Sequence, residues 1–413
     1  MAGIQTGLTD AQLLASQLKA HELVGQDLAT QADLDALALS SGNLTTEQIA
    51  MLGNLENNAD SFIVSNNIGQ ILFDAIPKES VAIDKILKIK TMDIELDKMN
   101  INTTATGREG SGSTDIIVNG DGLTHPKMIY VENGWNGYKY WLGATPYFGV
   151  VGINSEYENP HVFASNDLIT WVEPYGGKID SCDIGTSHYL SDTHLMLGSD
   201  SFLYCFYRDN TNTARKYYYK KSSDGIVWSK RFTIFDTDNI TNVSKNNIAL
   251  SPAFINKNNS IEVFDIMRSS GNLIIPSSTT CTSSFVMKRF ANNINDIGGF
   301  QEVNVQQVCR YDTRLWGNGI DPWHIDTIKT SKFYIQLINT GEVNGTDGSS
   351  LFLAYSLDGF NYKGLGEYEY YGEAFFYRSS LTLISETETD ITMKMVVAKK
   401  NGELSLVNLV VGV

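Results

Sequence analysis

The sequence predicts a mainly β protein: a five-bladed β-propeller preceded by an α-helical oligomeric stem. Three observations support this. Among the first 110 residues the only aromatic ones are Phe62 and Phe73, although the chain is rich in Tyr and Phe. Short apolar runs separated by Gly- and Asn-rich turns fill the remainder, as is typical of β-strands. A turn motif recurs there at intervals of roughly 60 residues, and such repetition is typical of radial architectures.

Residues 1–102 are expected to form the stem, which would oligomerise and attach the protein to its partners. Leu14 and Leu18 lie four positions apart, and Thr45-Thr46-Glu47 suits a helix start with a cap and an acidic first turn. A helix with one narrow apolar stripe cannot bury it alone, so bundling with copies of itself is the simplest solution. The alternative is a partly disordered leader. Residues 103–119 begin with a Gly-, Ser- and Thr-rich stretch, which predicts a linker.

Residues 120–413 are expected to form the propeller. A Ser-x-Asp turn followed by an aromatic residue occurs at 165–171, 222–228 and 356–362, and the Asp suits a tight hairpin turn. Degenerate copies are expected at 293–299 and 399–403, giving five units of four strands. The alternative is a large β-sandwich with recurring turns.

A polar cluster precedes or begins the first strand of each expected blade. In a propeller these strand starts meet at one mouth of the central channel, so we expect the clusters to converge into a polar funnel. Aromatic faces and planar polar groups of this kind bind sugars. The candidate ligand-binding residues are His125, Asp192, His194, Trp323, His324, Asp326, Tyr377 and Arg378. The alternatives are core packing for Trp323 and bonds to backbone amides inside the channel for Asp192 and Asp326.

Composition and spacing argue against several classes. The net charge of −16 disfavours a nucleic-acid binder. No apolar run reaches the length of a membrane span, and Met1 to Thr9 lack the features of a signal peptide. The four cysteines form no CxxC pair and are expected to be reduced core thiols. No spacing matches a calcium or zinc site, so neither a metal nor a cofactor is expected. The alternative is a metal site among Asp183, Asp192 and Asp326.

Catalysis is not expected from the funnel residues. Five-bladed propellers also resemble the glycosidases that cut arabinan, xylan and fructan, which place a carboxylate near the start of each of the first three blades. Here the equivalent positions hold His125, Asp192 and the segment Leu250–Pro252, with only one acid. A lone Asp cannot act as both acid and base in glycoside hydrolysis. The sequence therefore predicts that the chain is not an enzyme, with a propeller glycoside hydrolase or depolymerase as the alternative.

One resemblance makes the functional prediction more specific. The first expected blade resembles that of phage receptor-binding and tail-fibre proteins from tailed phages of Gram-positive, notably staphylococcal, bacteria. The similarity lies in His125-Pro126, 134–141, 157–160 and 164–171, and later in SDTH (191–194), SSDGIVW (222–228), SPAF (251–254) and WHID (323–326).

The resemblance implies a homotrimer in the virion tail or baseplate, made in the host cytoplasm and joined to other tail proteins through its stem. It also implies attachment to host cell-surface glycan, typically wall teichoic acid, without cleavage and without insertion into a membrane. A purely structural baseplate fibre is a further alternative.

Overall fold

The computed structural model divides the chain into two compact units, Met1–Ile86 and Leu87–Val413. Most of the expected stem falls in the first unit, which lies outside the described residues. The described residues are 87–93, 96–147, 155–182, 189–210, 215–236, 250–257, 260–268, 284–291, 308–311, 320–342, 351–368, 376–399 and 402–413.

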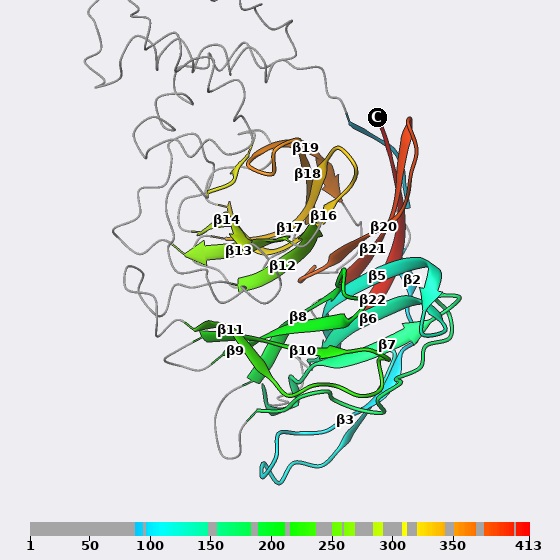
Figure 1. The fold of residues 1–413 in the computed structure, drawn as a ribbon, viewed down its shortest axis with the longest axis vertical. Helices are drawn as coiled ribbons and strands as arrows, with labels where there is room; N and C mark the ends of the chain where they lie inside the picture. Colours follow the sequence, from blue (N-terminus) through cyan, green and yellow to red (C-terminus); the bar gives the residue numbers. More distant parts are fainter. Residues whose placement is uncertain are drawn as a thin grey trace, which may run out of the picture. The chain divides into compact units, whose positions relative to one another are not determined.

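The second unit is built from sheets in a propeller-like arrangement (Figure 1), antiparallel except where β15 pairs with β19. The first sheet comprises β5 (Leu123–Trp135), β6 (Tyr138–Pro146) and β7 (His161–Ser165). The second comprises β8 (Tyr189–Leu197), β9 (Leu203–Asn210), β10 (Arg215–Ser222) and β11 (Phe232–Asp236). The third comprises β12 (Leu250–Lys257), β13 (Ser260–Arg268) and β14 (Ser284–Ala291).

Two further sheets follow along the chain. One comprises β16 (Ile320–Lys329), β17 (Tyr334–Glu342), β18 (Leu351–Ser356) and β19 (Asn361–Tyr368), with β15 (Arg310–Tyr311) at its edge. The other comprises β20 (Ser380–Glu386), β21 (Asp390–Ala398) and β22 (Leu404–Gly412), and β22 also pairs with β1 (Lys88–Met92) and β2 (Asp97–Lys98). β3 (Asn102–Ala105) and β4 (Ile116–Asn119) form a separate two-stranded sheet.

The first strand of each of these five sheets lies toward the centre. β5 contacts β8, β8 contacts β12, β12 contacts β16, β16 contacts β20, and β20 returns to β5. Apolar side chains fill the space between sheets, for example where the Phe206 and Phe254 rings stack with centroids 3.8 Å apart. The residues that begin these inner strands are therefore brought together from distant parts of the sequence.

The recurring turn has the expected structure wherever it is described. Oδ1 of Asp224 accepts hydrogen bonds from the N–H groups of Ile226 and Val227 at 2.8 and 2.7 Å. Asp167 and Asp358 accept the equivalent bonds in their own turns. The copies expected at 293–299 and around 400 lie wholly or partly outside the described residues.

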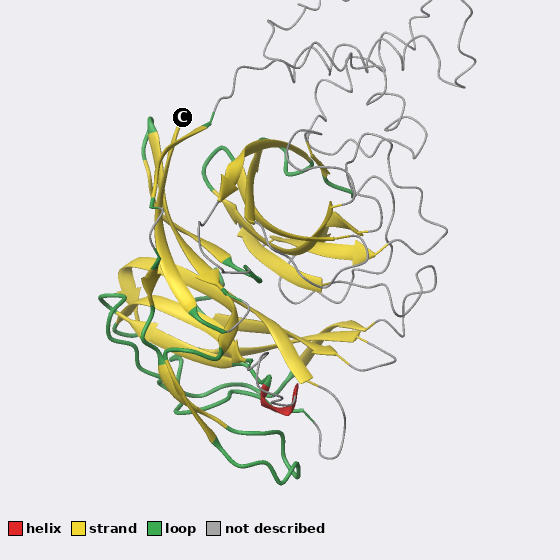
Figure 2. Cartoon of the chain, turned by 180° about the vertical axis from the view of Figure 1, so that it is seen from behind, coloured by secondary structure: helices red, strands yellow, loops and turns green. Residues whose placement is uncertain are grey.

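The prediction of a mainly β, propeller-like protein is confirmed. The number of strands in each sheet differs from the prediction. The sheets have three to five described strands instead of a uniform four. The described residues contain no α-helix, only a 3₁₀ turn, η2 (Ser155–Tyr157), drawn red in Figure 2. A helical stem therefore stays a prediction. No helix in the described part of the chain has the length and apolar character needed to cross a membrane.

Residues 87–119 differ from the expectation. Residues 87–102, assigned to the stem, contribute β1 and β2 to the last sheet. The expected linker, 103–119, forms most of the β3–β4 hairpin, and Ala105 and Val118 are buried in the core. Buried positions alternate with exposed ones along β3, so one face of this short strand is buried.

Candidate functional site

Three inner strands begin with the same backbone irregularity. His125, Asp192 and Ser251 have φ angles of 52°, 56° and 50°, although none is glycine. Each lies where the pairing register of its strand shifts, in β5, β8 and β12 respectively. A bulge re-aims a side chain, and left-handed backbone at a non-glycine residue concentrates at functional sites. The repeated bulge therefore marks one end of the central ring as a candidate site.

His125, Asp192 and His324 meet at this end, and we call them the His–Asp–His cluster. Nε2 of His125 lies 3.4 Å from Oδ1 of Asp192, and Nδ1 of His324 lies 3.8 Å from the same oxygen. Ser251 donates its hydroxyl hydrogen to Oδ1 of Asp192 at 3.2 Å and also contacts Nδ1 of His324. All three cluster residues are buried. They come from β5, β8 and β16, so the site depends on the ring being assembled.

Two guanidinium groups hold Asp192 in its charged form. Arg208 places Nε 2.8 Å from Oδ2 of Asp192, and Arg378 places Nη1 3.9 Å from Oδ1. Burial acts to raise the pKa of Asp192, but the positive charges of Arg208 and Arg378 outweigh it and hold that pKa below its ordinary range. The cluster therefore contains a carboxylate at neutral pH.

The two histidines of the cluster are neutral. Burial lowers the pKa of His125 to about 3, and burial likewise holds the pKa of His324 well below its ordinary value. Nε2 of both rings is buried without a hydrogen-bond partner among the described residues. A neutral imidazole with an uncommitted nitrogen is the form of histidine that binds a metal ion.

The donor set fits a divalent metal ion. His125, Asp192 and His324 each offer a ligand atom, and these atoms all lie within 4.8 Å of one another. Ligand atoms about 2.1 Å from a tetrahedral zinc are about 3.4 Å apart, which matches the 3.4 Å between His125 and Asp192. Three protein ligands with an open fourth position are typical of catalytic sites. Sequence spacing could not reveal this set, because its members belong to three sheets.

Glu158 is a site residue that sequence reasoning missed. It lies just after η2 and is buried; burial, together with the charge of Asp192, raises its pKa to about 8, against the opposite effect of Arg208. Its charge also acts on Tyr147 and Tyr377, whose rings stack with centroids 6.2 Å apart. The sequence signal was its place in the segment 157–160, which is part of the first-blade resemblance.

The structure separates the eight predicted residues into three groups. Tyr377 joins the His–Asp–His cluster, with its ring centroid 5.3 Å from that of His125 and 4.5 Å from that of His324, and Arg378 joins through Asp192. Trp323 is half-buried and packs on the core, with its ring at right angles to that of His324. The core alternative therefore holds for Trp323.

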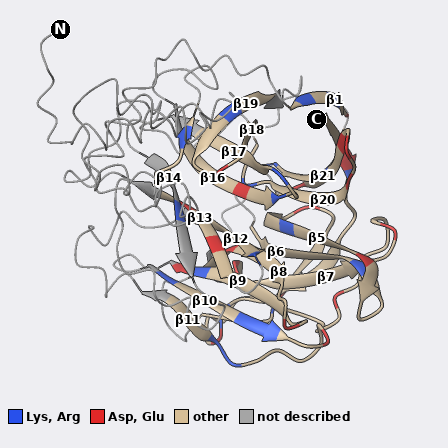
Figure 3. Ribbon diagram, turned by 45° about the horizontal axis from the view of Figure 1, so that its top comes forward, with Lys and Arg blue, Asp and Glu red and all other residues tan. Residues whose placement is uncertain are grey.

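His194 and Asp326 belong to a second polar layer. Oδ2 of Asp326 accepts hydrogen bonds from Nζ of Lys127 and from the N–H group of Leu381, both at 2.7 Å. Nε2 of His194 lies 3.0 Å from the carbonyl oxygen of Phe254. Lys127 on β5 and Asp326 on β16 thus form a buried ion pair. Figure 3 colours the basic and acidic residues of the ribbon. These residues join inner strands of different sheets, in agreement with the channel-packing alternative for Asp326.

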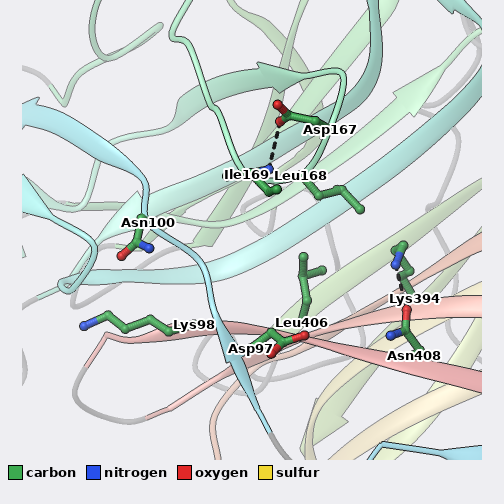
Figure 4. Close-up of a pocket in the computed structure, with 9 residues that line it drawn as sticks. All are labelled: Asp97, Lys98, Asn100, Asp167, Leu168, Ile169, Lys394, Leu406 and Asn408. Atoms are coloured by element: carbon green, nitrogen blue, oxygen red, sulfur yellow. Dashed lines mark hydrogen bonds between the residues drawn. The ribbon is translucent and has the colours of Figure 1, made fainter.

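A pocket of about 300 Å³ lies elsewhere on the molecule (Figure 4). It is lined by Asp97, Lys98, Asn100, Asp167, Leu168, Ile169, Lys394, Leu406 and Asn408. Lys394 donates a hydrogen bond to Asn408 at 2.6 Å, and Lys98 pairs with Asp121. The pocket shares no residue with the His–Asp–His cluster, so we assign the candidate chemistry to the cluster.

Comparison with known proteins identifies carbohydrate-processing enzymes. No protein-family model matches the chain. A curated relative, the A type blood N-acetyl-alpha-D-galactosamine deacetylase of Flavonifractor plautii, is 26% identical over 280 residues, which cover 60% of this chain and 35% of the relative. The chain therefore spans about a third of the length of that relative.

Solved structures agree in fold. An N-acetylgalactosamine deacetylase from F. plautii, crystallised with blood group B trisaccharide, matches with a TM-score of 0.55 and 18% identity, covering 76% of this chain and 95% of that one. A levansucrase of B. megaterium matches with a TM-score of 0.51 and 9% identity, covering 81% of this chain and 92% of that one.

These comparisons overturn the resemblance to phage tail proteins. The predicted receptor-binding function, the assignment to the virion and the prediction that the chain is not an enzyme are wrong, because the relatives found are bacterial carbohydrate-processing enzymes. The physical reason is that the shared motifs are Asp-containing turns and strand starts, which stabilise a propeller whatever it does. The chain is thus similar to a deacetylase in sequence and to deacetylase and levansucrase structures in fold.

Proposed function

We propose that this protein is a carbohydrate-active deacetylase that hydrolyses the acetamido group of an N-acetylated sugar. The observation that carries the proposal is the convergence of His125, Asp192 and His324, three ligand atoms that could hold a metal ion. Three protein ligands would leave a fourth position for water or substrate. The deacetylase relative supports the reaction and the sugar class.

The reaction breaks the C–N bond of the acetamido group and adds water, giving acetate and a free amine. Water must lose a proton as it attacks the carbonyl carbon, and the leaving nitrogen must gain one. Glu158 suits both transfers, because a carboxyl group with a pKa of about 8 exchanges protons readily near neutrality. Arg208 fixes the orientation of Asp192, as partners of metal-binding carboxylates do.

A divalent cation held by the His–Asp–His cluster would supply Lewis-acid chemistry at the acetamido oxygen. The chain's own contribution would be to hold three ligand atoms on three strands, exclude water by burial and keep both imidazoles neutral. Tyr377 stands against both imidazole rings and would contact the sugar or its acetyl group.

A propeller glycoside hydrolase is the second candidate. Asp192 and Glu158 are carboxyl groups in one site whose pKa values are moved in opposite directions, as expected for a nucleophile and a general acid. The fold of levansucrase is compatible with this reading. The deacetylase is preferred because two neutral histidines have no necessary part in glycoside hydrolysis by two carboxylates.

We also propose the finer architecture and assembly. The five sheets of three or more described strands, whose inner strands contact one another in a closed order, support a five-bladed propeller. Residues 1–86 would form the helical, oligomeric stem, with a homotrimer as the expected state. Size measurement in solution with and without residues 1–86 tests the stem.

The function is tested with oligosaccharides that end in N-acetylgalactosamine or N-acetylglucosamine. Acetate and free reducing ends are measured on the same samples, with added Zn²⁺ or Mn²⁺ and after chelation. Acetate release that depends on the metal and on His324 supports the deacetylase. Release of reducing ends without acetate would assign the site to glycoside hydrolysis instead. The matched control is His161→Ala, because His161 is a buried histidine that bonds Glu173 outside the cluster.

A further inference from the structure

The loop between β3 and β4, residues 106–115, lies against the segment that carries Glu158. Tyr157 donates its hydroxyl hydrogen to the carbonyl oxygen of Thr114 at 2.6 Å. Nδ2 of Asn159 donates to the carbonyl oxygen of Thr106 at 3.3 Å. The loop is therefore bonded to the residues on both sides of Glu158 in the sequence.

Glu156 strengthens the same contact. Ser113 donates its hydroxyl hydrogen to Oε1 of Glu156, and Nη2 of Arg108 lies 3.7 Å from Oε2. Glu156 and Asn159 are both buried, and Nδ2 of Asn159 also bonds the carbonyl oxygen of Glu156 at 3.0 Å. Bonds at three of the four residues 156–159 thus hold this segment to one loop.

The loop and β3 are in turn bonded to the segment that follows the first sheet, residues 173–178. Lys178 donates to the carbonyl oxygen of Gly107, and Thr103, on β3, donates to Oε2 of Glu173 at 2.7 Å. A stretch as rich in Gly and Ser as residues 107–113 has high chain entropy and no apolar side chains of its own to bury. Ordering this stretch costs conformational entropy, and these bonds offset that cost.

The other side of the Glu158 segment is bonded to a site strand. The N–H group of Leu190, on β8, donates to the carbonyl oxygen of Glu158 at 2.8 Å. Asp192 lies two residues further along β8. The backbone of Glu158 is thus held between the loop on one side and the strand of the His–Asp–His cluster on the other.

We propose that loop 106–115 is a brace that positions Glu158 for proton transfer, with Tyr157 and Asn159 as its positioning residues. The proposal rests on the proposed function, in which Glu158 handles the protons. It assigns a role in the site to a segment whose sequence looks like a linker. A carboxyl group displaced by about 1 Å from its reacting atom can lose about a hundredfold in rate, so positioning of this kind matters.

The test compares two Tyr→Phe variants. Tyr157→Phe removes the bond to Thr114, whereas the control Tyr204→Phe removes a bond of equal length, 2.6 Å, from Tyr204 to Asp200 on the second sheet. Amide hydrogen exchange of Leu190 is read by mass spectrometry, since that N–H group bonds Glu158 directly. kcat and KM for acetate release are measured in parallel.

We expect Tyr157→Phe to speed Leu190 exchange about tenfold over the control and to lower kcat about tenfold with KM nearly unchanged, as for the loss of one hydrogen bond. Equal exchange and equal kcat in the two variants would refute the brace. If the wild type releases no acetate, the proposed function fails, but the exchange result still decides whether the loop holds Glu158. Should Tyr157→Phe not fold, Ser113→Ala is measured in its place, with the same two outcomes.

Discussion

Two polar layers lie on the same inner strands but differ in backbone conformation and in how their charged side chains pair. The upper layer is the His–Asp–His cluster: His125 on β5, Asp192 on β8 and His324 on β16. The lower layer lies two residues further along each strand and consists of Lys127, His194 and Asp326. In both layers, side chains from different inner strands contact one another, so both layers face the centre of the ring.

The lower layer contains a buried charge pair that is bonded to the backbone of β20. Lys127 and Asp326 pair at 2.7 Å, and both also bond the backbone of Leu381. In the upper layer Nε2 of His125 and Nε2 of His324 have no hydrogen-bond partner among the described residues, and the backbone is left-handed at His125 and Asp192. Buried His and Asp are thus present in both layers. Nδ1 of His194 and Oδ1 of Asp326 in the lower layer also lack a hydrogen-bond partner among the described residues. Backbone strain, more than unpaired atoms or residue type, therefore distinguishes the candidate ligand site from structural packing.

The largest expected effect is a loss of kcat when the central ligand of the upper layer is changed. Asp192→Asn removes the charge of the central ligand and should lower kcat for acetate release at least about a thousandfold, since metal and nucleophile positioning are lost together. Metal affinity measured by calorimetry should fall in parallel. Retention of wild-type activity by this variant would remove Asp192 from the site.

The matched change in the lower layer should act on stability. Asp326→Asn leaves Lys127 buried without its charge partner, and we expect about 3–5 kcal/mol less free energy of unfolding. Urea titration checks the free energy, and acetate release checks that the kcat of the remaining folded protein stays within a few fold of wild type. A variant that is fully stable but inactive would contradict the division into two layers.

Glu158 gives the upper layer a signature in the pH dependence of stability. Its pKa rises from 4.5 to about 8 on folding, so between these values the folded protein binds more protons than the unfolded chain. Stability contributed by this group is full below pH 4.5 and falls as the pH rises toward 8, by at most about 1.4 kcal/mol per unit. Glu158→Gln should remove this decline, measured by denaturant unfolding of metal-free protein at pH 5 to 8. An identical slope in wild type and variant would place the pKa of Glu158 near its ordinary value.

The smallest effect concerns the strained backbone of the upper layer. Ser251 has a φ of 50°, where a Cβ is unfavourable. The free energy of unfolding of Ser251→Gly should therefore be about 1 kcal/mol higher than that of Ser251→Ala, although both variants lose the same hydroxyl group. Thermal unfolding of the two variants checks this difference, and a more stable Ala variant would argue against strain at this bulge.

The sequence was informative where local chemistry determines structure. The turn at Asp224 could be predicted, because one carboxylate bonding two N–H groups needs only its neighbours. His125, Asp192 and His324 could be proposed together, because polar residues at equivalent strand starts converge in any propeller. The hydrogen-bond and charge partners of these three residues could not be predicted, because the partners come from other sheets.

Other features depend on long-range contacts. Glu158 lies on no inner strand, and only folding brings it near Asp192. The strand Lys88–Met92 looks polar, and it is a strand because β22 offers it an edge. The predicted function failed for a related reason, since the motifs that carried the resemblance serve the fold more than any chemistry.

The pairing of β1 with β22 has a consequence for the order of folding. Asp93, just after β1, accepts hydrogen bonds from Asn408, 315 positions later. During synthesis β1 emerges before every other described strand, yet its partner emerges last. Until then the nascent chain carries an open sheet edge, which is a known aggregation hazard. Completion of the last sheet therefore closes this edge, and a chain shortened before β22 should be recovered as aggregate.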